Sequence, residues 1–295
     1  MRRFAALVLA AVIALGTSGC GQSASTPAAP RPSTSAASTA TSSPMTYAAL
    51  GDSYSAAPGN PTTSSAGGCL RSDHDYPHLV AEKLHIARLD DVTCSGAQTK
   101  DFTGRQQPYD GSAPIPPQLD AVTPSTDLVT VSIGGNDLNL IGLLYSCGQL
   151  AQSTPNGSPC RDKYAADIER AVPQVQQRVV DAVGAVHRKA PHARILVVGY
   201  PQPFPRRGTC AALPLAPGDY RFAASIMDRL NQMLSAAAAA ADATYVDVAG
   251  PSRGHDICSA SPWINGAQAT DDAQPIHPFP REQSAVAALI ERALR

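Results

Sequence analysis

The sequence of 295 residues has few aromatic side chains, no cluster of basic residues and no apolar run long enough for a transmembrane helix. Five Phe and one Trp are present, so the core must consist mainly of Val, Leu, Ile and Ala. The formal net charge is -1, and without a Lys/Arg cluster the chain has no electrostatic footprint for nucleic acid. The Cys-x-x-Cys spacing typical of zinc and redox sites is missing as well. We therefore expect no nucleic-acid partner, no metal and no organic cofactor.

The N-terminal residues predict export. Arg2 and Arg3 precede a short apolar run, residues 4–15, which ends in small residues and a cysteine. This is the pattern of a signal peptide, and we assign it to residues 1–20. Cys20 follows Gly-Thr-Ser-Gly, which resembles the lipobox of bacterial lipoproteins, although Thr17 stands where Leu is usual. Acylation of Cys20 would anchor the protein to a membrane; the alternative is cleavage elsewhere near this site and a soluble secreted protein.

Composition divides the rest of the chain into a linker and one domain. Residues 21–44 are almost wholly Ser, Thr, Ala and Pro, and such a segment cannot bury enough apolar surface to offset its ordering entropy. We predict a disordered spacer there. The remaining residues, 45–295, are enough for a single α/β enzyme domain with long loops, which we expect to be monomeric.

Six cysteines remain once Cys20 is set aside, and an even number in an exported domain indicates disulfides. Six cysteines allow fifteen pairings. Proximity along the chain favours three of them: Cys69–Cys94, Cys147–Cys160 and Cys210–Cys258.

Short apolar runs alternate with helical patterns along the domain. The runs are residues 46–50, 91–94, 127–133, 193–199 and 243–248, and the helical stretches are residues 76–84, 163–189, 219–241 and 282–294. This alternation predicts a parallel sheet covered by helices on both faces. Ligands bind beyond the carboxyl ends of such strands, and Ser53, Gly96 and Asn136 each follow a predicted strand. Two Gly- and Pro-rich segments, residues 54–75 and 100–117, are expected to form pocket walls.

Four motifs in order resemble those of the GDSL/SGNH hydrolase family. They are Leu50-Gly51-Asp52-Ser53-Tyr54-Ser55, Cys94-Ser95-Gly96-Ala97, Ser132-Ile133-Gly134-Gly135-Asn136-Asp137 and His277-Pro278. The second glycine of the Gly-x-Ser-x-Gly elbow is absent, which disfavours the α/β-hydrolase family. The resemblance is closest to the secreted bacterial lipase, esterase and phospholipase branch with three disulfides. It implies a three-layer α/β/α sandwich, flavodoxin-like, with five parallel strands.

The resemblance also implies a role for each motif. Ser53 is the expected nucleophile and His277 the base that activates it. The backbone N–H groups of Ser53 and Gly96 and the side-chain amide of Asn136 are expected to form the oxyanion hole. The predicted activity is hydrolysis of lipid or other acyl esters through an acyl-enzyme on Ser53.

The sequence departs from the family at the acid of the triad. The usual pattern is Asp-x-x-His, but Gln274 stands three residues before His277. Either the main-chain carbonyl of Gln274 orients the imidazole, or Asp271 or Asp272 reaches it, or His277 acts with water alone. We favour the Gln274 carbonyl, because a carbonyl can fix the tautomer of the ring.

Alternatives to this interpretation remain open. His255, beside Asp256, is the main rival base. The same acyl-enzyme would also serve an acyltransferase that passes the acyl group to a sugar or lipid hydroxyl. A non-catalytic lipoprotein that binds a wall or lipid component in the same cleft is the alternative from a different class.

Overall fold

The computed structural model describes residues 45–295. The predicted signal peptide, Cys20 and the linker at 21–44 lie outside the described residues. Within 45–295, no helix is both long enough and apolar enough to cross a membrane.

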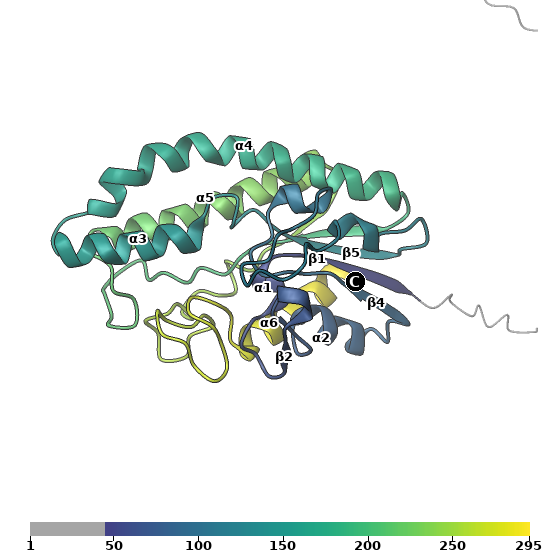
Figure 1. Cartoon of the computed structure of the whole chain (residues 1–295), viewed down its shortest axis with the longest axis horizontal. Coiled ribbons are helices and arrows are strands. Elements are labelled where there is room, and N and C mark those ends of the chain that lie inside the picture. Colours follow the sequence, from purple (N-terminus) through teal and green to yellow (C-terminus); the bar gives the residue numbers. More distant parts are fainter. Residues whose placement is uncertain (1–44) are drawn as a thin grey trace, which may run out of the picture. The chain divides into compact units, whose positions relative to one another are not determined.

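A five-stranded parallel sheet forms the centre of the domain (Figure 1). Its strand order is β4-β1-β5-β6-β7, the doubly wound order of flavodoxin-like folds. The strands are β1 (Thr46–Gly51), β4 (Arg88–Asp91), β5 (Leu128–Ser132), β6 (Arg194–Val198) and β7 (Thr244–Val246). All five residues of the central strand β5 are buried, as expected for a strand covered on both faces.

Helices cover both faces of the sheet. On one face lie α3 (Leu140–Ser153), α4 (Pro159–Lys189) and α5 (Asp219–Ala240); on the other lie α2 (Tyr76–Lys83) and α6 (Pro280–Leu294) (Figure 1). Two separate apolar clusters correspond to these two faces. The arrangement confirms the predicted three-layer α/β/α sandwich.

Short elements make up the loops near the first motif. They are α1 (Ser53–Ala56), the two-residue strands β2 (Thr63–Ser64) and β3 (Arg71–Ser72), and the 3-10 turns η1 (Ala66–Gly68), η2 (Thr99–Phe102) and η3 (Gln118–Ala121). The strands β2 and β3 pair in an antiparallel ribbon. Cys69–Cys94, Cys147–Cys160 and Cys210–Cys258 are the disulfides of the described chain.

Two elements differ from the sequence prediction. The strand expected at residues 91–94 is β4, Arg88–Asp91, and residues 92–94 continue from it as extended chain held by Val92 N–H to Ala49 O and Cys94 N–H to Gly51 O. Helix α3 is not among the predicted helices, because it directly follows the Gly134-Gly135-Asn136-Asp137 turn, which interrupts the apolar pattern. That helix proves important for the site.

Candidate active site

Ser53 lies at the carboxyl edge of the sheet, where β1 turns into α1. Asp52 is the N-cap of α1, and its Oδ1 accepts the Tyr54 N–H at 2.9 Å. Its Oδ2 accepts the hydroxyl of Tyr200, which follows β6. Asp52 is 1% exposed, and this burial raises its pKa to about 7. The aspartate of the first motif therefore fixes the turn that presents Ser53.

His277 directly contacts Ser53 although 224 positions separate them in the sequence. Its Nε2 lies 2.8 Å from Ser53 Oγ. The ring is 5.8 Å from that of Tyr54, centroid to centroid, and the Tyr54 hydroxyl donates to the carbonyl of Ile276 at 2.8 Å. Burial lowers the pKa of His277 below its usual value, against an opposing effect of the Pro275 carbonyl. The imidazole is therefore neutral at neutral pH and able to accept a proton.

The carbonyl that meets the other ring nitrogen belongs to Pro275, so the choice of Gln274 was wrong. His277 Nδ1 lies 2.8 Å from Pro275 O, while Gln274 O accepts the backbone N–H of His277 at 3.2 Å. Ile276 between them has a φ of 60°, a left-handed conformation that is rare for a β-branched residue. The chain turns sharply at Ile276, and this turn brings the carbonyl of Pro275, two residues before His277, to the ring in place of the carbonyl of Gln274.

Neither aspartate of the loop contacts the histidine. Asp271 and Asp272 are exposed, and within residues 45–295 their carboxylates make no hydrogen bond; Asp272 contributes only its carbonyl, to Asn60 Nδ2. The rival base His255 is also remote from this contact. Its Nδ1 bonds Ser261 O at 2.8 Å and its ring stacks on Trp263.

The second and third motifs meet beside Ser53. The Nδ2 group of Asn136 donates to Ala97 O at 3.0 Å, and Gln98 Nε2 donates to Asn136 O at 3.0 Å. Gly96 has a φ of 81°, a left-handed conformation that glycine adopts without the strain that a Cβ would add. In the described part of the chain, the N–H groups of Ser53 and Gly96 have no acceptor.

An apolar pocket opens next to Ser53 and Asn136. Its walls come mainly from α3 and from α5 with the segment before it: Leu140, Ile141, Leu143, Leu144, Pro203, Phe204, Ala223, Ile226 and Met227. Past Leu144 and Ile276 the surface continues into an open groove with Tyr145, Leu213 and Leu215. Residues 54–75 and 100–117, expected as pocket walls, contribute only Tyr54 to this pocket. The walls are suited to a hydrocarbon chain.

Comparisons with known proteins agree with this geometry. The profile of the GDSL-like Lipase/Acylhydrolase family matches residues 49–281. Lipase 2 of Streptomyces coelicolor is 40% identical over 243 residues, which are 79% of this chain and 80% of that protein. The crystal structure of phospholipase A1 from Streptomyces albidoflavus superposes with a TM-score of 0.71 at 30% identity, covering 85% of this chain and 99% of that one. An extracellular lipase from Streptomyces rimosus superposes with a TM-score of 0.70 at 29% identity, covering 84% and 99%.

Proposed function

The chain belongs to the GDSL-like lipase/acylhydrolase family, and from this premise we propose that it cleaves acyl esters through an acyl-enzyme formed on Ser53. It is a carboxylic-ester hydrolase of the lipase and esterase type. The observation that carries the assignment of Ser53 is its 2.8 Å contact with His277 Nε2. A serine hydroxyl is too weakly acidic to attack an ester until a base within hydrogen-bond distance removes its proton.

The proposed reaction has four proton transfers to or from one nitrogen, two in acylation and two in deacylation. His277 Nε2 takes the proton of Ser53 while Oγ attacks the ester carbonyl carbon, and the resulting imidazolium returns this proton to the leaving alcohol as the C–O bond breaks. Water then gives a proton to the same nitrogen as its oxygen attacks the acyl-enzyme carbonyl carbon, and the imidazolium returns this proton to Ser53 Oγ as the acyl C–Oγ bond breaks, which releases the acid and restores Ser53.

The tetrahedral intermediates place negative charge on the former carbonyl oxygen. The free N–H groups of Ser53 and Gly96 support a role as donors to that oxygen. Asn136 Nδ2 has two hydrogens, and one donates to Ala97 O, so the second remains for the substrate. Each such donor contributes about 3 kcal/mol to transition-state stabilisation.

We assign the orienting role to the Pro275 carbonyl. It accepts from Nδ1, which places the proton of the neutral ring on Nδ1 and leaves the Nε2 lone pair for Ser53. A carbonyl carries no full charge, so it stabilises the imidazolium less than a carboxylate would.

Replacement of Asp271 or Asp272 by Asn should leave most of the activity intact. Both side chains are exposed and neither contacts His277, so removal of their charge leaves the orienting bond unchanged. The measurement is kcat/KM on a p-nitrophenyl ester for each single variant. A loss of about 1,000-fold in either variant would show that a carboxylate orients the ring.

The apolar pocket supports lipid acyl chains as the acyl part of the substrate. Each methylene buried in the pocket contributes about 0.8 kcal/mol to binding of the acyl chain. Burial of two of the additional methylenes of octanoate is therefore enough to raise kcat/KM for p-nitrophenyl octanoate about tenfold above that for the acetate, and burial of more would raise it further. Phospholipid and triacylglycerol substrates complete the panel. Activity on acetate alone would contradict an acyl-chain pocket.

A variant that fills the pocket sharpens this test. Ile141→Trp should lower octanoate hydrolysis and spare acetate hydrolysis, because the indole occupies space that only the longer chain uses. Ser153→Trp, at the exposed end of the same helix, is the matched control and should leave both rates unchanged.

We further propose that the enzyme acts outside the cytoplasm as a monomer. Three disulfides support export, because such bonds persist in oxidising compartments. Acylation of Cys20 would then hold the enzyme at a membrane, near lipid substrates.

A further inference from the structure

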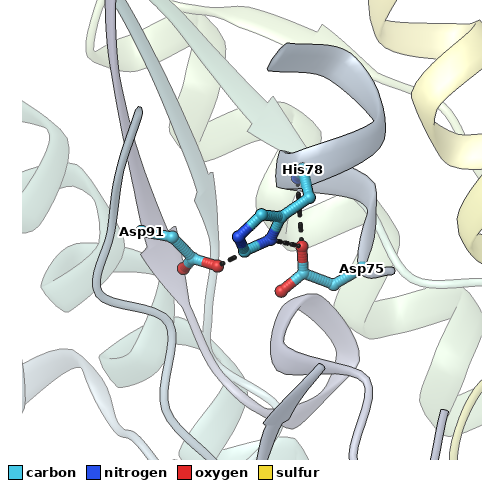
Figure 2. A group of neighbouring side chains, drawn as sticks. All are labelled: Asp75, His78 and Asp91. Carbon is cyan, nitrogen blue, oxygen red and sulfur yellow. Dashed lines mark hydrogen bonds and ion pairs between the residues drawn. The ribbon is translucent and has the colours of Figure 1, made fainter. Parts of the chain in front are cut away.

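Asp75, His78 and Asp91 form a cluster separate from the catalytic residues, between α2 and β4. Asp75 is the N-cap of α2, His78 lies in the first turn of that helix, and Asp91 ends β4. Figure 2 shows both carboxylates directed at the imidazole from opposite sides. His78 Nδ1 lies 2.7 Å from Asp75 Oδ1 and 3.6 Å from Asp91 Oδ2.

The two carboxylates are buried with an unused oxygen each. Asp75 is fully buried and the side chain of Asp91 is 5% exposed. The Oδ2 atoms of both are buried and accept no hydrogen bond within residues 45–295. Buried polar atoms without a partner are rare in folded proteins and call for an explanation such as an ion. The side chain of His78 is 38% exposed, which leaves a path from solvent.

We propose that Asp75, His78 and Asp91 bind one Zn²⁺ ion. One imidazole and two carboxylates suit zinc, whereas Ca²⁺ and Mg²⁺ take oxygen ligands almost exclusively. Zinc bonds of about 2.0–2.2 Å in a tetrahedron place the donor atoms about 3.3–3.6 Å apart. The 3.6 Å separation of His78 Nδ1 from Asp91 Oδ2 agrees with this range. The 2.7 Å separation of Nδ1 from Asp75 Oδ1 is too short for two ligands of one ion. Rotation of the Asp75 side chain would lengthen this separation or place Oδ2 at the ion instead. Water takes the fourth position on the exposed side.

The surrounding groups support binding of a cation. Asp91 Oδ1 already accepts Thr93 N–H at 2.9 Å and Thr93 Oγ1 at 2.7 Å, which orients the carboxylate for its other oxygen. The side chain of Arg71 also lies near Asp91 and carries a positive charge. Its guanidinium lies 3.5 Å from Asp91 Oδ1 and donates two hydrogen bonds to Thr93 O, so it leaves Oδ2 free.

The ion would hold together elements that shape the active site. In the sequence, Asp91 is followed by Thr93, Cys94 and Gly96, and Cys94 forms a disulfide with Cys69. Zinc at this place would therefore brace α2 against the loop that carries the Gly96 N–H. Its role is structural, and no step of ester cleavage passes through it.

Titration of the chelator-treated full chain with ZnCl₂ by isothermal calorimetry tests the proposal. We expect one Zn²⁺ per chain and a rise in the melting temperature. His78→Gln and Asp91→Asn should each weaken binding by about 100-fold or more, because even the loss of a residue that only orients a ligand costs about 10- to 100-fold. His74→Gln is the matched control: His74 is exposed and bonds Asp73 outside the cluster, so this variant should bind like the wild type. Absence of stoichiometric binding, or binding that both cluster variants retain, would overturn the proposal.

A spectroscopic measurement on the unaltered protein does not depend on folding of the variants. Co²⁺ should give visible d–d absorption of a four-coordinate site, and one equivalent of Zn²⁺ should remove it. Absence of these bands would mean that the carboxylates hold a protonated imidazole instead. Calcium that binds as tightly as zinc in the same calorimetric experiment would contradict the assignment of the metal.

Discussion

Ser53→Ala should lower kcat/KM for ester hydrolysis by about 10⁴-fold or more, with little change in substrate affinity. The Ser53 hydroxyl is the only group that we assign to covalent chemistry. Alanine removes it, and in the part of the chain that the structure describes no other side chain hydrogen-bonds His277 Nε2. The helix cap that positions residue 53 comes from the side chain of Asp52, so the turn itself is preserved. Initial rates on p-nitrophenyl octanoate and the melting temperature should be measured together.

Ser65→Ala provides the control for this substitution. Ser65 is exposed and makes no side-chain capping bond at η1, so its loss should leave both rate and melting temperature unchanged. A Ser53→Ala enzyme with normal folding and more than about a tenth of wild-type activity would require another nucleophile.

His277→Asn should lower kcat/KM by about 10³- to 10⁴-fold, because within residues 45–295 His277 Nε2 is the only group that hydrogen-bonds Ser53 Oγ and could remove its proton. The rival His255 bonds Ser261 O and stacks on Trp263, so His255→Asn should retain activity. If His255→Asn were the inactive variant and His277→Asn the active one, the assignment of the base would be reversed.

The pH dependence of the wild type reports the same residue. The base acts in its neutral form, so kcat/KM rises as pH increases through the pKa of His277 and then levels off. Burial lowers that pKa, which places the inflection below the ordinary histidine value of about 6.5. The NMR titration of the His277 ring, identified by its loss in His277→Asn, should show the same midpoint. A midpoint well above the ordinary value would contradict a base buried beside a carbonyl.

The fold and the positions of the motifs could be predicted from local sequence. Buried strands give continuous apolar runs, and the carboxyl ends of parallel strands gather at one edge, so Ser53 and Asn136 were expected together. The family match confirms the resemblance that the four ordered motifs indicated.

Other parts of the site depend on information that local patterns do not contain. The choice of Pro275 over Gln274 follows from the left-handed backbone at Ile276, and nothing in an isoleucine predicts that conformation. Helix α3 has apolar residues from Leu140 onward that could have indicated a pocket wall. The cluster of His78 with Asp91 joins a helix to a strand end, and only the packing of α2 on β4 shows it.

Reaction of the protein with a fluorophosphonate probe, followed by digestion and mass spectrometry, tests the central claim most directly. A fluorophosphonate phosphonylates a serine only where a base activates it and donors stabilise the oxyanion. The account predicts one adduct per chain, on the peptide that contains Ser53, and its loss in Ser53→Ala. An adduct on a different residue, or no adduct on folded protein, would contradict it.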